Sequence, residues 1–265
     1  STNLNALNST NLQALTTAQM AALTTTQVSN LTSTQLNLME TSDIAALSTA
    51  GVAQISSTNL NALNSTNLQA LTTAQMAALT TTQVSNLTST QLNLMETSDI
   101  AALSTAGVAQ ISSTNLNALN STNLQALTTA QNAALTSTQA GNLTSTQLNL
   151  MQTSDIAALT TTAVSNLTST QLNALNTTNL DALSTAGVAQ ISSTNLNVLN
   201  STNLQALTTG QMAALTTTQV SNLTSTQLNL METSDIAALS TAGVAQISST
   251  NLNALNSTNL QALTT

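Results

Sequence analysis

The chain repeats itself every eight residues. Read from Leu7, its units are LNSTNLQA, LTTAQMAA, LTTTQVSN, LTSTQLNL, METSDIAA, LSTAGVAQ and ISSTNLNA, after which LNSTNLQA returns. The frame never slips across 32 complete octads, from residues 7 to 262 of the 265. Position one is always Leu, Ile or Met, position three is always Ser or Thr, and position six is aliphatic except at Asn132 and Ala140. The octad is therefore the expected structural unit.

Seven octads form a longer repeat, and one copy of it carries an insertion. The segment STNLNALNSTNLQALTT begins at Ser1, Ser57, Ser113, Ser193 and Ser249. Three of these steps span seven octads and one spans ten, because three extra octads occupy residues 159–182. An array in which each unit contacts only its neighbours tolerates such an insertion, whereas a globular core rarely does. We expect one continuous octad array over residues 1–265.

Neither a long helix nor a long strand suits this period. Eight residues at about 100° each would rotate an apolar stripe by about 80° per octad, and positions one and six would face opposite sides of a strand. A short helix in every octad fits better. In LTTAQMAA, Thr16 and Gln19 have the spacing of a capping box, and Leu15 and Met20 that of a hydrophobic staple.

The predicted fold is an all-α repeat, a solenoid of short helices of about six residues with one helix per octad. Such helices are unstable alone and must stack, so positions one and six would form the core. A β-solenoid is the alternative. The helix cap could lie at position two or three, because Glu40, Glu96, Gln152 and Glu232 are poor caps at position two. Representative core residues are Leu15, Met20, Leu23, Val28, Leu31, Leu36, Met39, Ile44, Leu47, Val52, Ile55 and Leu60.

The composition excludes several functions. The chain has no Lys, Arg, His, Cys, Pro or aromatic residue. Nucleic-acid binding and polybasic membrane binding need cations, and the apolar runs are too short for a membrane-spanning helix. Nucleophilic catalysis of the Ser-His-Asp or Cys-His type lacks its base. We therefore expect no enzyme activity, no cofactor, no nucleic-acid partner and no membrane insertion.

The acidic residues are the weak candidates for a metal site. Glu40 and Asp43 lie three residues apart in METSD, and the pair recurs as Glu96 with Asp99 and as Glu232 with Asp235. Paired carboxylates could bind Ca²⁺ or act in general acid–base chemistry. However, Ca²⁺ takes six to eight oxygen ligands, and Gln152 replaces the Glu in another copy. We favour solvated acids in the first turn of a helix, where the helix dipole stabilises them.

The octads LTTAQMAALTTTQVSNLTSTQLNLM resemble the LTTxQ repeats of very large secreted adhesin-like proteins of proteobacteria, which are described as haem-utilisation, adhesion or calcium-binding repeat proteins. The resemblance covers the whole chain. It implies an exported, extracellular or cell-surface repeat region within a longer polypeptide. The Gly-Gly-x-Gly-x-Asp calcium repeats that often accompany such regions are missing here, so calcium binding is not implied.

These observations favour a structural protein over an enzyme. Eight acidic residues over 265 residues give a weakly charged surface, and low charge favours association. We expect a self-associating segment of an extracellular filament, sheath or adhesin stalk, whose partners are copies of itself. The alternative is a repeat surface that binds carbohydrate, ice or a host surface, although the lack of aromatic residues counts against sugar recognition.

Overall fold

The computed structural model describes residues 7–263. These residues form short α-helices and no strand, so the predicted all-α repeat solenoid is confirmed and the β-solenoid is wrong. The chain falls into two compact units, residues 1–134 and 135–265. The octad frame is the same in both units.

The helices of the first unit have the following bounds: α2 Ser9–Gln13, α3 Thr17–Ala21, α4 Thr25–Ser29, α5 Ser33–Leu38, α6 Thr41–Ala46, α7 Thr49–Val52, α8 Ser57–Asn61, α9 Ser65–Gln69, α10 Thr73–Ala77, α11 Thr81–Asn86, α12 Ser89–Leu94, α13 Thr97–Ala102, α14 Thr105–Val108, α15 Ser113–Asn117, α16 Ser121–Gln125 and α17 Thr129–Ala133.

Those of the second unit are α18 Ser137–Asn142, α19 Ser145–Leu150, α20 Thr153–Ala158, α21 Thr161–Ser165, α22 Ser169–Ala174, α23 Thr177–Ala182, α24 Thr185–Val188, α25 Ser193–Asn197, α26 Ser201–Gln205, α27 Thr209–Ala213, α28 Thr217–Ser221, α29 Ser225–Leu230, α30 Thr233–Ala238, α31 Thr241–Val244, α32 Ser249–Asn253 and α33 Ser257–Ala262.

Each helix begins at position three of its octad, so the N-cap is position two. In α3, the Thr16 side chain accepts from the backbone N–H of Gln19, and the Gln19 side chain accepts from the backbone N–H of Thr16. This is the capping box that the sequence predicts. Glu40 and Glu96 also stand at the N-cap, but their side chains make no capping bond. The strict Ser or Thr of position three is the first helical residue.

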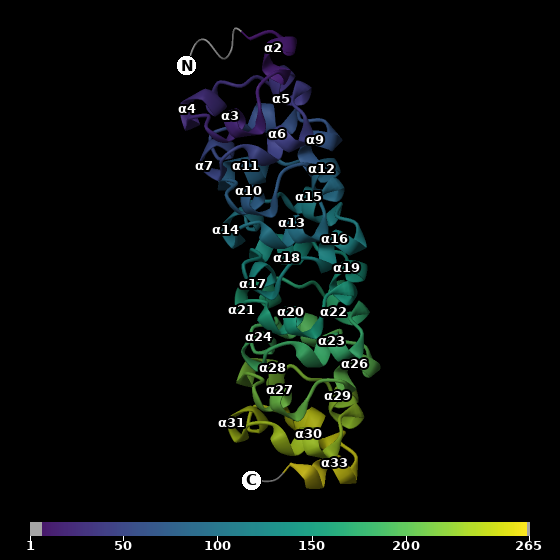
Figure 1. Cartoon of the computed structure of the whole chain (residues 1–265). Helices are drawn as coiled ribbons and strands as arrows, with labels where there is room; N and C mark the ends of the chain where they lie inside the picture. The colour runs from purple at the N-terminus through teal and green to yellow at the C-terminus, as the bar shows by residue number, and fades with distance from the viewer. Residues whose placement is uncertain (1–6, 264–265) are drawn as a thin grey trace. The chain divides into compact units, whose positions relative to one another are not determined.

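Within each unit the helices wind into a solenoid whose turn contains between three and four octads. Each helix packs against the helix three places later, such as α4 against α7 and α28 against α31 (Figure 1). Side-chain hydrogen bonds between turns join residues 25 to 31 positions apart, such as Asn37 to Ala62 and Gln75 to Ile44. Stacking of this kind supplies the stability that a single helix of four to six residues lacks.

Positions one and six form the core of each unit. Of the representative core residues, Met20, Val28, Leu31, Leu36, Met39, Ile44, Leu47, Val52, Ile55 and Leu60 are buried. Leu15 and Leu23 are half-buried instead. These two residues belong to the first described turn, which is covered by a neighbouring turn on one side only.

Candidate functional site

Buried amides recur at position five of the octads. Gln75 of α10 shows the arrangement. Its Oε1 accepts from the backbone N–H of Thr72 at 2.7 Å, which completes the helix cap. Its Nε2 donates to the carbonyl oxygens of Ile44 at 2.9 Å and Leu47 at 2.7 Å. One amide therefore closes its own helix and also binds the preceding turn.

The same link recurs along both units, with the acceptor carbonyls at the sequence separations of 31 and 28 that Gln75 shows. Buried polar groups are costly unless they are hydrogen-bonded, and at Gln residues such as Gln83 both ends of the amide are hydrogen-bonded. The amides that make these bonds include Asn67, Gln75, Gln83, Asn123, Gln131, Gln171, Asn179, Asn203, Gln211, Gln219 and Asn259.

Sequence reasoning assigned position five to the helix cap and missed this second bond. The available signal was chemical: position five is Gln or Asn in most octads, and both side chains carry a donor and an acceptor. The helix cap by itself uses the acceptor alone. A second, more exposed link runs from position seven, where Asn37 Nδ2 donates to the Ala62 carbonyl at 2.7 Å and Asn37 Oδ1 accepts from the Asn64 backbone N–H.

Four octads place Asp at position five, and this overturns part of the expectation for the acids. Asp43, Asp99 and Asp235 do lie in the first turn of their helices, but they are buried rather than solvated, with 3–5% of their surface exposed. Position five faces inward because its side chain lies against the preceding turn. The Glu side chains at position two are exposed as expected: Glu40, Glu96 and Glu232.

Burial raises the pKa of all three Asp carboxyls, because it disfavours the charged form. Repulsion from Glu40 raises the pKa of Asp43 further, and Glu96 does the same for Asp99. The bond from the Glu96 backbone N–H lowers the pKa of Asp99. For Asp235, the Thr209 hydroxyl bond at 3.1 Å lowers the pKa, and Glu232 raises it.

The surroundings of the acids bear on the weak metal-site candidates. No group of three or more His, Cys, Asp or Glu side chains gathers within residues 7–263. Glu40 lines a hollow of about 530 Å³ whose other polar side chains are Asn37, Thr41, Asn64, Thr66 and Asn67. This hollow holds a single carboxylate, whereas a protein Ca²⁺ site draws on six to eight oxygen ligands.

A second packing rule operates where position five is Gly. A Cβ placed on Gly51 would lie 2.9 Å from Val28 Cγ2, and a Cβ on Gly107 would lie 3.0 Å from Val84 Cγ2. The same relation joins Gly187 to Val164 and Gly243 to Val220. In each case the Val is position six of the third octad before that of the Gly. The Gly is thus required by the close approach of two helices.

The inserted octads of residues 159–182 obey this rule. Val164 lies within the insertion and is the partner of Gly187. Ala163 stands at position five, and position six of the third octad before it is Ala140. Both Ala residues are fully buried, and their helices α18 and α21 contact each other. A Val–Gly pair is thus replaced by an Ala–Ala pair of similar summed size. Ala140, which departs from the position-six pattern, has a packing counterpart.

Asn132, the other departure, remains inside the fold. It is buried in α17, and its Nδ2 donates to the carbonyls of Leu127 and Thr128 at 3.2 Å. Helix α17 keeps its capping box. Gly141 follows Ala140 in α18, where a Cβ would lie 3.0 Å from the Asn166 carbonyl oxygen. Both helices keep the lengths found in the other octads.

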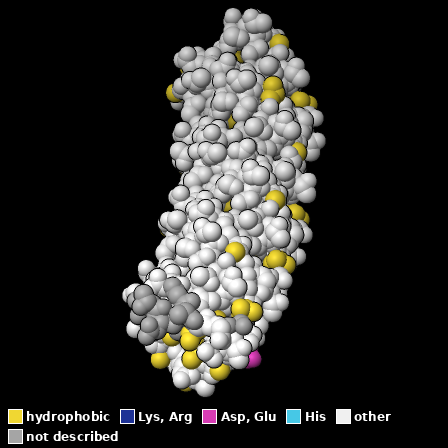
Figure 2. All heavy atoms as spheres, turned by 90° about the horizontal axis from the view of Figure 1, so that it is seen from above, with side chains coloured by type: hydrophobic (Ala, Val, Ile, Leu, Met, Phe, Trp, Pro, Cys, Tyr) yellow, Lys and Arg dark blue, Asp and Glu magenta, His cyan; other side chains and the backbone are white. Residues whose placement is uncertain are grey.

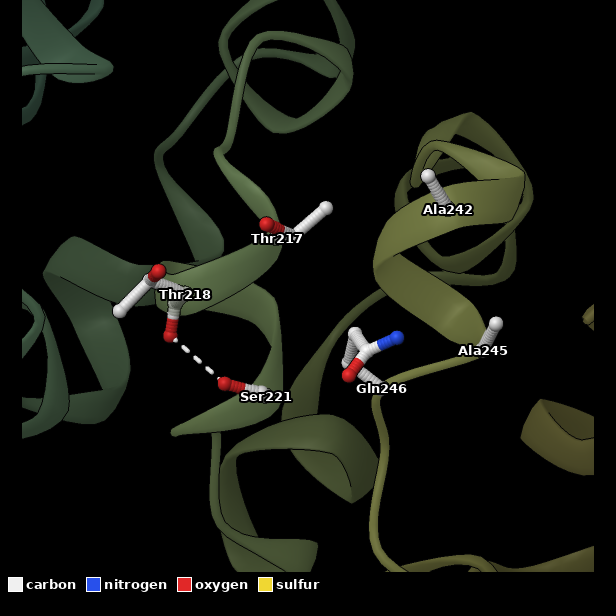
Figure 3. Close-up of a pocket in the computed structure, with 6 residues that line it drawn as sticks. All are labelled: Thr217, Thr218, Ser221, Ala242, Ala245 and Gln246. Carbon is white, nitrogen blue, oxygen red and sulfur yellow. Dashed lines mark hydrogen bonds between the residues drawn. The ribbon is translucent and has the colours of Figure 1, made fainter.

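A shallow pocket of about 290 Å³ lies between α28 and α31. Figure 3 shows Thr217 and Thr218 on one wall, Ala242, Ala245 and Gln246 on the other, and Ser221 hydrogen-bonded to the Thr218 carbonyl at 3.0 Å. The lining is uncharged. Hydroxyl and amide groups of this kind can accept and donate hydrogen bonds, but they supply no nucleophile–base pair.

No helix among the described residues is long and apolar enough to span a membrane. No curated protein matches the chain. A family model for the ALTTAQ repeat matches it eight times, at residues 1–33, 36–73, 52–89, 92–129, 108–145, 148–185, 188–225 and 228–265. From residue 36 onward, successive matches begin two or five whole octads apart, which preserves the octad frame. The chain belongs to the ALTTAQ repeat family.

Proposed function

We propose that the chain is a structural segment of a secreted or cell-surface protein, without catalytic activity, that associates with copies of itself. An extracellular filament, a sheath and the stalk of an adhesin are the assemblies that suit it. The observation that carries the structural role is the link made by the position-five amides. Within each unit it joins successive turns by bonds from a side-chain amide to backbone carbonyls, so the fold can be extended by whole octads without a new core.

Self-association is supported by the chemistry of the surface. The chain has no cation and eight acidic residues, so electrostatic repulsion between copies is weak for its size. Figure 2 shows a largely polar face with small separate hydrophobic patches. Position eight contributes exposed aliphatic side chains, with Leu38, Leu230 and Val198 being 37%, 36% and 52% exposed. Such side chains are suited to lateral contacts between copies.

Light scattering over a wide range of protein concentration, combined with electron microscopy, tests the proposal. We expect the apparent mass to rise with concentration and fibres or bundles to form. The variant Leu38→Gln/Val198→Gln/Leu230→Gln should lower this association while leaving the helical circular dichroism unchanged. The matched control Thr58→Gln/Thr178→Gln/Thr218→Gln alters exposed polar positions. A chain that stays monomeric at high concentration would contradict the proposal.

The second candidate function is a repeat surface that binds a ligand such as a carbohydrate. It is favoured by the uncharged pocket between α28 and α31, which offers hydroxyl and amide groups. Screening against a glycan array, followed by titration calorimetry, would show saturable binding in that case. Loss of binding in Thr217→Val would place the ligand in this pocket, whereas the structural role predicts no saturable ligand.

A further inference from the structure

A Gln at position five makes two kinds of hydrogen bond, and each kind uses a different atom of the amide. In α11, Gln83 Oε1 accepts from the backbone N–H of Thr80 at 2.8 Å. Gln83 Nε2 donates to the carbonyl oxygens of Val52 at 2.9 Å and Ile55 at 2.8 Å. The first bond needs an acceptor and the second needs a donor. An ionised carboxylate is an acceptor only, and a protonated carboxyl has one donor.

Asp99 occupies the same position in α13. The backbone N–H of Glu96 donates to its carboxylate, as the backbone N–H of Thr80 donates to Gln83. By the sequence separations of 28 and 31 that Gln83 shows, the corresponding carbonyls of the preceding turn are those of Leu71 and Leu68. The Leu68 carbonyl already accepts from the Leu71 backbone N–H, just as the Ile44 carbonyl does from the Leu47 backbone N–H while also binding the Gln75 amide. For Asp235 the corresponding carbonyls are those of Leu207 and Leu204, and for Asp43 those of Leu15 and Leu12.

No positive charge is available to hold these carboxylates ionised. The chain contains no Lys, Arg or His. Helix α13 packs against α10 and α16, α30 against α27 and α33, and α6 against α3 and α9. None of these six neighbouring helices contains an ionisable side chain. The charged groups beside the three Asp residues are the acids of their own octads, namely Glu96, Glu232 and Glu40.

We propose that Asp43, Asp99 and Asp235 are protonation-dependent links between turns of the solenoid. In the neutral state the carboxyl O–H donates to a backbone carbonyl of the preceding turn, as the Gln and Asn amides do. In the ionised state the bond to the carbonyl is absent, because a carboxylate has no donor. Asp235 then keeps only the bond that it accepts from the Thr209 hydroxyl at 3.1 Å. The solenoid is therefore tighter in acid than at neutral pH. This device does not depend on whether the chain assembles with copies of itself.

The direction of the pKa shifts agrees with this arrangement. Desolvation raises the pKa of each of the three carboxyls above the ordinary Asp value of about 3.9. A group whose folded pKa is raised stabilises the fold in its protonated form. That contribution is fully present below the ordinary value and is lost as the pH rises through the raised pKa. The stabilisation should thus appear on acidification.

The test compares Asp99→Asn and Asp235→Asn with Asp181→Asn in the full chain. Asn fits the position because Asn67 and Asn123 occupy it in other octads and make the link. Asp181 is exposed at position seven, so its variant removes the same charge without adding a donor that faces the preceding turn from position five. Melting temperatures are measured by circular dichroism at about pH 7 and about pH 3.

We expect Asp99→Asn and Asp235→Asn to raise the melting temperature at neutral pH by on the order of several degrees. The triple variant that also carries Asp43→Asn should lose much of the stabilisation that the parent chain gains in acid. Asp181→Asn should change neither quantity appreciably. If it raised the melting temperature as much as Asp99→Asn does, the effect would be one of net charge and the proposal would be overturned.

A second measurement tests the protonation of the Asp carboxyls in the parent chain directly, without relying on a change in stability. The carboxyl carbon of each Asp is followed by NMR during an acid titration of the parent chain, with assignments from the single Asn variants. We expect Asp99 and Asp235 to titrate above the ordinary Asp value, with the amide protons of the preceding turn exchanging more slowly in acid. Titration at or below the ordinary value would overturn the proposal.

Discussion

Helices α10 and α13 both begin at position three of their octads, but position five is Gln75 in α10 and Asp99 in α13. Gln75 of α10 binds the Thr72 backbone N–H with its oxygen and two carbonyls of the preceding turn with its nitrogen. Asp99 of α13 accepts the bond from Glu96 but, when ionised, has no donor to offer backward. The same helix can therefore form with or without its link to the preceding turn, since the two bonds are chemically separable.

The octad that follows Asp99 also lacks an amide at position five. Gly107 of α14 brings that helix close against Val84 of α11. Two consecutive octads thus replace the polar link, first by a titratable acid and then by close apolar contact. The comparison shows that an octad can be joined to its neighbours by either means.

The largest effect is expected from filling the close contact. In Gly107→Leu the new side chain would meet Val84 Cγ2, since even a Cβ would lie 3.0 Å from it. We expect the free energy of unfolding to fall by about 3 kcal/mol, the upper end of the range for overpacking. Urea denaturation followed by circular dichroism measures this change.

Gly210→Ala is the matched control, because its Cβ would meet nothing nearer than 3.8 Å. It should raise the free energy of unfolding by about 0.4–1 kcal/mol, since Ala restricts the unfolded chain. Gly107→Ala combined with Val84→Ala reproduces the Ala140–Ala163 combination and should be more stable than Gly107→Ala alone. A double variant no more stable than the single one would argue against the size-complementary pair.

The next effect comes from turning an amide octad into an acid octad. Gln83→Glu keeps the shape of the side chain but replaces the donor to Val52 and Ile55 by an acceptor. We expect a loss of about 2 kcal/mol at neutral pH, because a buried charged group is left without its partner. The loss should shrink as the pH falls and the new Glu is protonated.

Gln110→Glu provides the control for charge, since Gln110 is exposed. Its free energy of unfolding should stay within about 0.5 kcal/mol of the parent chain at neutral and acid pH. If Gln83→Glu and Gln110→Glu lowered the free energy of unfolding equally, the bonds from Gln83 to the preceding turn would have no special role in stability.

The smallest effect concerns the N-cap. Thr72 caps α10 through its hydroxyl, whereas Glu96 makes no capping bond in α13. Thr72→Ala should cost about 1 kcal/mol, and Glu96→Thr should add about 0.5–1 kcal/mol. Equilibrium urea denaturation of both variants measures the difference. A Glu96→Thr variant less stable than the parent chain would mean that Glu96 has a role beyond the cap.

Much of the fold follows from the octad pattern alone. The period excludes a continuous helix and a strand, and the Thr16–Gln19 spacing predicts a capped helix in every octad. The aliphatic positions one and six identify the core, as Met20 and Leu31 illustrate. The octad pattern allows the cap at position two or three, because Glu at position two is a poor cap. The structure places the cap at position two and shows that Glu40 and Glu96 occupy it without a capping bond.

The sequence by itself determined the repeating unit, the helix in it, the apolar stripe and the lack of cations. These are local properties, which follow from helix propensity, from the spacing of residues within an octad and from composition. Only the tertiary structure decided that a turn holds between three and four octads, that position five faces the preceding turn, and that Asp99 is buried. It also showed that the insertion brings Val164 to meet Gly187. Such relations join residues three to four octads apart, and that separation is set by how helices stack, which no single octad encodes.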